Sequence, residues 1–197
     1  AETMQHFSTG INFERSAGGI RANIIHPGYS EGVDDGNIQA IRFADTLTDP
    51  YEVTLINNTI CGGASDPDLV PPIWPSAIAL GNAAVSIDNN IFFGTHAGSY
   101  WIIDENTNGH VTSLRNNLFY YYPDSGTMTL YEDDSYASDG EDQGDTLQMW
   151  TTIAELEDSY ADGGRGPGGE GVPAEGNLLL TDPPDMGFAD IDGPDDD

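Results

Sequence analysis

Lysine is absent from this chain, and cysteine occurs once, as Cys61. Five arginines stand against 34 acidic residues, so the formal net charge is −29 over 197 residues. Phosphate binding needs a basic surface, and this balance therefore excludes nucleic acid as a partner and disfavours anionic membranes. A single cysteine excludes an intrachain disulfide and a cysteine-based metal cluster.

Long apolar runs are also missing. No segment approaches the ~20 apolar residues that span a bilayer. The N-terminal stretch AETMQHFSTG lacks the basic-then-apolar order of a signal peptide, so the chain is read as a mature product or as a fragment. Its acidity suits a high-salt habitat or a calcium-rich exterior, and we expect an extracellular or cell-surface location.

What the chain does contain is a repeated phrase. VTLINNTICGG (53–63) returns as VSIDNNIFFGT (85–95) and VTSLRNNLFYY (111–121). Alignment on the second Asn of each pair adds two weaker copies and gives five anchors: Asn23, Asn58, Asn90, Asn117 and Asn177. The first four anchors lie 35, 32 and 27 residues apart, a drifting period that is typical of a solenoid.

Two columns of residues around the anchors are purely apolar. Three residues before the first four anchors stand Ile20, Leu55, Ile87 and Leu114, and two residues after all five stand Ile25, Ile60, Phe92, Phe119 and Leu179. Alternation on both sides of a fixed turn predicts strand, turn and strand. Further apolar runs at 39–45, 76–82, 100–106 and 127–133 add a third strand to each repeat. Stacked repeats would bury a core that one repeat cannot, and the Asn side chains at the tight corners would hydrogen-bond along a ladder.

This pattern resembles the right-handed parallel β-helix of pectate-lyase-like secreted proteins, whose coils carry V-x-I-x-N-N-x-I/F and an Asn ladder. The resemblance covers residues 18 to 133 and resumes near 176. It implies an all-β fold of about four to five coils, with three short strands in each coil. The alternative is a β-sandwich with repeated NN hairpins, which does not predict the same inward residue class at every anchor.

The C-terminal third departs from the repeat. We expect coils over 1–132, then an acidic loop, a short amphipathic helix and a Gly-rich loop over 133–175, and a final strand with an acidic tail over 176–197. The helix should span about 146–161, because apolar side chains recur at spacings of three or four: Leu147, Trp150, Ile153, Leu156 and Tyr160. Asp145 would cap this helix, with Gln148 as its reciprocal partner.

The resemblance also implies where an active site would lie. Polysaccharide lyases on this scaffold use a Lys or Arg base beside calcium-binding carboxylates that neutralise uronate. Arg42 is the one arginine placed like such a base, and Asp34, Asp35 and Asp45 would be the calcium ligands. The alternative for Arg42 is a surface ion pair. The pattern requires no cofactor, and calcium is the metal that the carboxylate excess suits, although no calcium-binding motif is complete.

Aromatic and imidazole side chains on loops and strand ends are the candidate ligand-binding residues: Trp74, His96, Trp101, Tyr121 and Tyr122. Rings on the outside of a solenoid can stack on sugar faces, which makes a polysaccharide or glycan the expected partner. The alternatives are that Trp74 covers the side of the solenoid and that His96 is a turn residue. Phe93 and Tyr120 share one column and either meet sugar or pack beneath the helix of Trp150.

The sequence favours a noncatalytic extracellular or cell-surface module with a structural or adhesive role, one that contacts glycans. The alternative is a carbohydrate-active enzyme, a polysaccharide lyase or glycosidase, although the lack of lysine leaves a lyase few bases. A second alternative is a self-assembling filament or array element. Both ends of the solenoid are expected to be uncapped, which would permit end-to-end self-association or a continuing chain.

Overall fold

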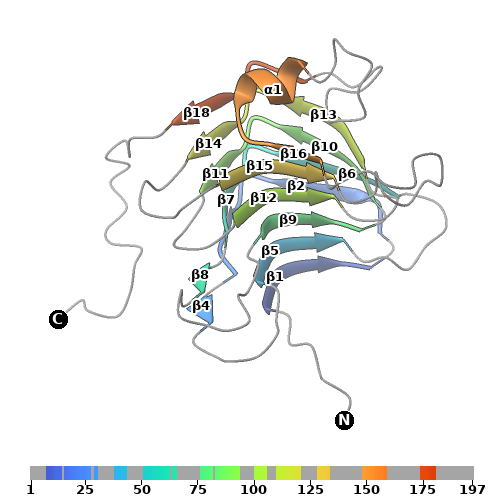
Figure 1. Cartoon of the computed structure of the whole chain (residues 1–197). Helices are drawn as coiled ribbons and strands as arrows, with labels where there is room; N and C mark the ends of the chain where they lie inside the picture. Colours follow the sequence, from blue (N-terminus) through green and yellow to red (C-terminus); the bar gives the residue numbers. More distant parts are fainter. Residues whose placement is uncertain are drawn as a thin grey trace, which may run out of the picture.

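The computed structural model describes residues 8–14, 16–27, 29–30, 38–43, 51–62, 64–65, 76–81, 83–93, 100–105, 110–120, 128–133, 148–158 and 174–180. Most of these residues lie in β-strands, and one short helix, α1 (Ile153–Asp158), accompanies them (Figure 1). The mainly β fold with stacked parallel strands is the one that the sequence predicts.

Three large sheets run along the molecule, and we name them A, B and C. In spatial order, sheet A contains β1 (Ser8–Phe13), β5 (Ile38–Phe43), β9 (Ser76–Leu80), β12 (Tyr100–Glu105), β15 (Met128–Asp133) and β16 (Gln148–Trp150). Sheet B contains β2 (Gly18–Arg21), β6 (Tyr51–Ile56), β10 (Ala83–Asp88), β13 (His110–Arg115) and β17 (Ala174–Glu175). Sheet C contains β3 (Ile24–Ile25), β7 (Thr59–Cys61), β11 (Ile91–Phe93), β14 (Leu118–Tyr120) and β18 (Leu178–Leu180). The short strands β4 (Tyr29–Ser30) and β8 (Ala64–Ser65) pair separately.

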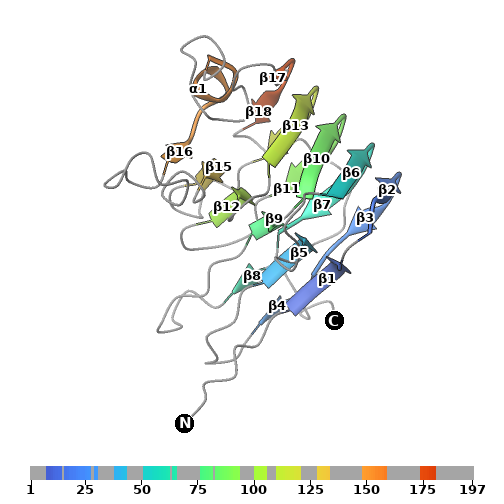
Figure 2. The same cartoon turned by 90° about the vertical axis from the view of Figure 1, so that its right-hand side faces the viewer.

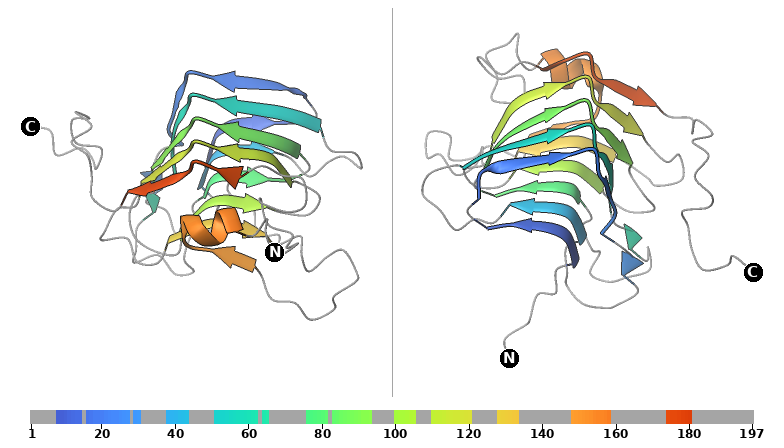
Figure 3. Two further views of the ribbon diagram at one scale, coloured as in Figure 1. Left: turned by 90° about the horizontal axis from the view of Figure 1, so that it is seen from above. Right: turned by 180° about the vertical axis from the view of Figure 1, so that it is seen from behind.

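The chain visits sheets A, B and C in turn, and we call each set of three strands a layer. Layers 1 to 4 are β1–β2–β3, β5–β6–β7, β9–β10–β11 and β12–β13–β14, and layer 5 is β15–β17–β18. Pairing between layers is parallel throughout; β16, which comes after β15, is antiparallel to it. The bend from sheet B into sheet C lies at the same place in every layer (Figure 3).

The core lies between the three sheets and is filled by columns of like side chains. In sheet B the column Ile20, Leu55, Ile87 and Leu114 is buried, and its register partners follow one another from layer to layer. In sheet C the column Ile25, Ile60, Phe92 and Phe119 is buried in the same way. The rings of Phe92 and Phe119 stack with their centroids 5.2 Å apart. Such columns make each layer depend on its neighbours for burial.

The helix is shorter than the sequence spacing suggests, and the expected cap is wrong. Gln148–Trp150 form β16, and Trp150 pairs with Tyr131 of β15, their rings meeting edge-on at 5.5 Å. The helix begins only at Ile153, after Thr152, and packs Leu156 into the core at 0% exposure. Burial of Trp150 in a strand on the end of sheet A therefore overrides the apolar spacing that favoured one long helix.

Candidate functional site

Each corner between sheets B and C is made by a residue in the left-handed αL region. Asn57, Asn89 and Asn116 have φ values of 57°, 58° and 54°, and Ala22 and Gly176 take the same position at 55° and 70°. Asn tolerates this conformation because its short polar side chain costs little there. The first Asn of each pair thus makes the turn, which leaves the second Asn free for another role.

The second Asn of each pair joins the layers. Asn58, Asn90 and Asn117 are each 1% exposed. The Nδ2 of Asn90 donates to Leu55 O of layer 2 at 2.9 Å and to Asn117 Oδ1 of layer 4 at 3.2 Å. Its Oδ1 accepts from the backbone N of Asn58 at 2.9 Å and from Asn58 Nδ2 at 3.0 Å. The amide of Asn90 is therefore saturated, as a buried amide must be.

Asn–Asn bonds of the same kind run from Asn23 to Asn177, so that five asparagines form one continuous ladder. Asn58 donates to Ile20 O at 2.9 Å, and Asn117 donates to Ile87 O at 2.8 Å and to Asn177 Oδ1 at 3.0 Å. The Asn–Asn bonds have one direction, because the donor is always the Asn of the earlier layer and the acceptor is always the Asn of the next one. Donors consequently remain to be satisfied at the layer 5 end, and an acceptor remains at the layer 1 end.

Glu157 of α1 closes the donor end of this ladder. Its Oε1 accepts from the backbone N of Asn177 at 2.9 Å and from Asn177 Nδ2 at 3.1 Å, the two bonds that a following Asn would accept. A carboxylate is a stronger acceptor than an amide for two converging donors. The expectation that both ends are uncapped is therefore wrong for this end (Figure 2 shows α1 at the end of the stack opposite β1 and β2).

A capping box positions the helix that carries Glu157. Thr152 N donates to Glu155 Oε2 at 3.2 Å, and Glu155 N donates to Thr152 Oγ1 at 3.2 Å. Thr151 adds a further bond from its N to the same carboxylate oxygen, at 3.3 Å. Hydrogen bonds from the Thr152 side chain and the Thr151 backbone lower the pKa of Glu155 from its ordinary value of 4.5. These bonds fix the first turn of α1 and so the direction in which Glu157 points.

At the other end, Asn23 is exposed and its bonds are incomplete. Asn23 N and Nδ2 donate to Asn58 Oδ1 at 3.1 and 3.4 Å, and Nδ2 also donates to Arg21 O within the same corner, at 2.8 Å. Within the described part of the chain, no donor reaches Asn23 Oδ1. This is the ladder atom that a preceding layer would use.

Asp88 and Arg115 are register partners in the outward-facing column of sheet B, but they do not form an ion pair with each other. Arg115 Nε instead lies 3.2 Å from Glu175 Oε1 of layer 5, and Asp88 accepts from the hydroxyls of Ser113, at 2.6 Å, and Ser86. The Arg115–Glu175 pair is largely exposed and adds little stability.

Arg42, the candidate base, is half-buried in β5. Its register partners on the two neighbouring strands are Asn12 and Ala79. The predicted calcium ligands Asp34, Asp35 and Asp45 lie outside the described residues. Among the residues that are described, no three His, Cys, Asp or Glu side chains are grouped to hold a metal ion.

Of the predicted ligand-binding residues, only Trp101 falls in the described part of the chain; Trp74, His96, Tyr121 and Tyr122 lie outside it. Trp101 lies in β12, with Ser76 and Thr129 as its register partners, and Gln39 pairs with Ser76 in turn. Gln39, Ser76 and Thr129 are buried polar residues. Gln39 Oε1 and Ser76 Oγ have no hydrogen-bond partner in the described structure. Nothing periodic in the sequence marks this polar column, because its members do not share a residue type.

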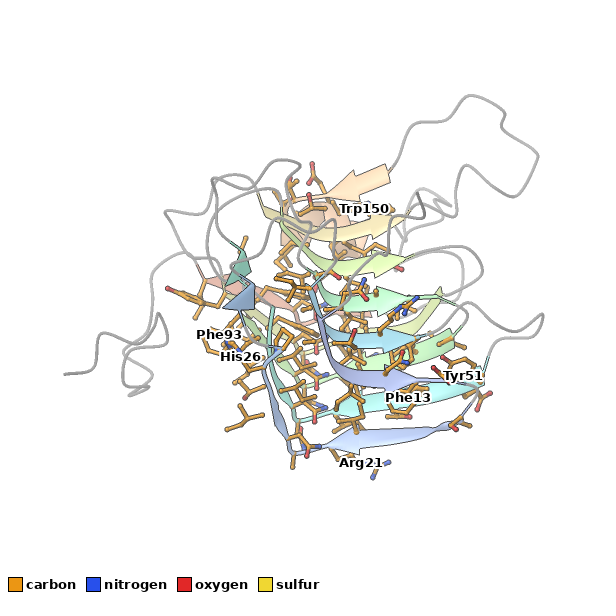
Figure 4. The ribbon with its side chains drawn as sticks, turned by 90° about the horizontal axis from the view of Figure 1, so that it is seen from below. Phe13, Arg21, His26, Tyr51, Phe93 and Trp150 are labelled. Carbon is orange, nitrogen blue, oxygen red and sulfur yellow. The ribbon has the colours of Figure 1, made fainter. Side chains whose placement is uncertain are left out.

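Phe93 and Tyr120 are not displayed on the surface. With Cys61 they form a small buried cluster on the opposite face of sheet C from the core, with each of the three at most 7% exposed. Trp150 belongs to the main core and not to this cluster, so the two rings do not pack beneath it. Burial raises the pKa of the Cys61 thiol. His26, three residues after Asn23, is exposed on the same side of the stack as Phe93 (Figure 4).

Comparison with known proteins adds no relative. No family model, curated protein or solved structure matches this chain. Within the residues that the structure describes, no helix is long and apolar enough to cross a membrane.

Proposed function

We propose that this chain is a right-handed parallel β-helix of the pectate-lyase-like type, acting as a noncatalytic structural or adhesive module outside the cell or on its surface. The fold proposal is supported by three stacked parallel sheets visited in a fixed order and by a five-membered Asn ladder. Such a solenoid is a rigid rod. Its stacked layers fix the residue class at each inward position, whereas the loops between the strands can differ in length and sequence.

The observation that carries the functional proposal is how completely the ladder satisfies the Asn amides at the corners of the layers. The amides of Asn58, Asn90, Asn117 and Asn177 each bond to both neighbouring layers or to Glu157. These groups hold layers together and leave no hydrogen-bonding capacity for a substrate. The arrangement favours a stiff module and therefore a structural role.

Surface chemistry supports an extracellular setting and a neutral partner. A net charge of −29 repels anionic polymers and keeps the module soluble. Glycan contact would use the connections between sheets C and A, where the sequence places Trp74, His96, Tyr121 and Tyr122. The strand ends that those connections join are stacked on one another, so a chain-like ligand could meet several layers.

The proposal is tested by incubating the 197-residue chain with a panel of uronate and neutral polysaccharides in the presence of calcium. We expect no unsaturated product by ultraviolet absorption and no new reducing ends, with retention of the protein on one or more of the immobilised polymers. Product formation that disappears in Arg42→Ala but persists in Arg21→Ala would overturn the noncatalytic assignment in favour of a lyase.

A further inference from the structure

The corner of layer 2 differs from the other corners in the residue that follows the ladder Asn. That position holds an aliphatic residue in layers 1, 3, 4 and 5, namely Ile24, Ile91, Leu118 and Leu178, and Thr59 in layer 2. Thr59 pairs in register with Ile24 on one side and Ile91 on the other, in the outward column of sheet C. Layer 2 therefore places a hydroxyl in a column that is otherwise aliphatic.

This threonine completes a recognition triplet for N-glycosylation. Asn57-Asn58-Thr59 is the single Asn-x-Ser/Thr triplet with x other than proline in the 197-residue sequence. The Asn corners of layers 3 and 4 lack its third member, since Ile91 and Leu118 stand where the hydroxyl would be. Three residues can match by chance, so the exposure and the backbone of the triplet decide whether it is an acceptor.

The triplet divides its side chains between the surface and the core. Asn57 is exposed and Thr59 is half-buried, whereas Asn58 between them is 1% exposed and bonds to the layers on both sides. Asn57 makes the turn, with a φ of 57°, and its backbone N donates to Asp88 O at 3.4 Å. Among the described residues, no hydrogen bond engages the side-chain amide of Asn57. Its Nδ2 is thus available at the surface, while the ladder depends on Asn58 alone.

The neighbouring corners leave room for a bulky group at Asn57. The residue at the same corner of layer 1 is Ala22, which carries only a methyl group, and that of layer 3 is Asn89. Successive layers are roughly 4.8 Å apart, the spacing of paired strands. A group attached to Asn57 would extend outward from the bend between sheets B and C, which lies on the outside of the stack (Figure 3). An exposed turn of this kind is the structural context that N-glycosylation requires.

We infer that Asn57 is an N-glycosylation acceptor and carries an oligosaccharide. In the transfer, Nδ2 of Asn57 forms a bond to the anomeric carbon of a lipid-linked oligosaccharide, and the bond from that carbon to the lipid phosphate oxygen breaks. The phosphate leaves with the electron pair, and Nδ2 gives up one proton, so the step needs no oxidant or reductant. The hydroxyl of Thr59 is the group by which the transferase recognises the triplet.

The inference rests on the extracellular or cell-surface location in the proposed function, because this transfer is made on chains that are exported from the cytoplasm. It does not depend on the noncatalytic assignment. A glycosylated chain that also cleaved polysaccharide would refute that assignment alone, and an unglycosylated chain without activity would refute this inference alone.

The test is secretion of the full 197-residue chain, behind a cleavable signal sequence, from a eukaryotic host that N-glycosylates exported proteins. The intact mass is measured before and after treatment with peptide N-glycosidase, which converts a glycosylated Asn to Asp and so marks the position. Thr59→Val removes the hydroxyl and keeps the β-branched shape, whereas Thr59→Ser keeps the hydroxyl. Ile91→Thr is the matched gain-of-site variant, because it supplies the missing hydroxyl two residues after Asn89 at the corner of layer 3.

We expect a glycan on Asn57 of the wild type, none in Thr59→Val, retention in Thr59→Ser, and a second glycan, on Asn89, in Ile91→Thr. Equal melting temperatures of the deglycosylated wild type and Thr59→Val would show that the loss does not come from misfolding. A secreted wild-type chain without a glycan would overturn the inference and leave Thr59 as a β-branched strand residue. A glycan that persists in Thr59→Val would overturn it as well, because the attachment would then lie elsewhere.

Discussion

The two ends of the stack are built from the same repeat and finished in opposite ways. At the layer 5 end, β16 and α1 leave the repeat and bring Trp150, Leu156 and Glu157 over the last layer. At the layer 1 end, nothing in the described structure covers β1, β2 and β3, and Asn23 is exposed. Ends of one solenoid thus need not be equivalent.

The direction of the ladder explains why the donor end is the one with a dedicated partner. Asn177 is 4% exposed, so its N–H groups are shielded from water and need a protein acceptor. At the opposite end the unfilled atom is the Oδ1 of an exposed Asn23, which water can reach. Hydrogen bonding therefore demands a protein acceptor at the donor end, where the Glu157 carboxylate supplies it, whereas a protein donor for Asn23 Oδ1 at the other end is optional.

The largest effect should come from the middle of the ladder, compared with its open end. Asn90→Ala removes the acceptor for two Asn58 donors and the donor for Leu55 O and Asn117 Oδ1. With buried groups left unpaired, we expect a loss of about 3–5 kcal/mol in the free energy of unfolding, measured by urea denaturation. Asn23→Ala removes the two Nδ2 bonds of an exposed residue and should cost less than about 1 kcal/mol. Equal losses of unfolding free energy in the two variants would show that the stabilisation by a ladder Asn does not depend on its burial.

The next effect concerns the closed end. Glu157→Ala leaves the two Asn177 donors unpaired and should lower the free energy of unfolding by about 2 kcal/mol. Glu157→Gln keeps an acceptor oxygen without the charge and should lose about half as much. The matched control is Glu175→Ala, whose exposed ion pair with Arg115 should be worth at most about 0.5 kcal/mol. If the Glu175 and Glu157 variants unfold alike in urea, Glu157 is an ordinary surface residue.

Sequence reasoning succeeds for the interior and stops where the repeat stops. The anchors Asn58, Asn90 and Asn117 and the columns beside them could be found because stacking imposes one residue class on each inward position. Glu157 could not be found in that way, since it comes from a single insertion between Asn117 and Asn177 and its partner is 20 residues away. Nothing periodic marks it.

Local signals were nevertheless present in that insertion. The Thr152-x-x-Glu155 spacing is a capping box that sets the helix start at Ile153, while the apolar spacing of Leu147, Trp150 and Ile153 suggests an earlier start. The capping residues decide where the helix begins because they satisfy backbone N–H groups, and Trp150 is already buried in the strand β16. Register likewise places Asp88 beside Arg115. It does not show that Arg115 pairs with Glu175 of the next layer in preference to Asp88.

A third, smaller effect sharpens the comparison at the corner of layer 1. Ala22 holds a φ of 55° where the next three layers place Asn57, Asn89 and Asn116. A residue with an ordinary Cβ is strained there by about 1 kcal/mol. Ala22→Asn should therefore raise the free energy of unfolding by about 0.5–1 kcal/mol, and Asn57→Ala should lower it by a similar amount. A loss of stability in Ala22→Asn on thermal or urea unfolding would contradict this account of the corners.

The smallest expected effect is the pH dependence of the closed end. Hydrogen bonds from Thr152 and Thr151 lower the pKa of Glu155 in the folded chain below its ordinary 4.5. A carboxyl whose folded pKa is depressed stabilises the fold above its unfolded pKa, and this contribution is lost as the pH falls through the folded value. Between pH 7 and about pH 3, the stability of Glu155→Gln should thus change less with pH than that of the wild type, and the two curves should approach each other at the acid end.

Glu52→Gln removes one exposed charge from β6 without touching α1 and serves as the control. Because Glu155 is exposed, solvent screens its bonds and keeps the difference small; a Glu52 variant that flattens the curve equally would assign the effect to net charge and not to the capping box.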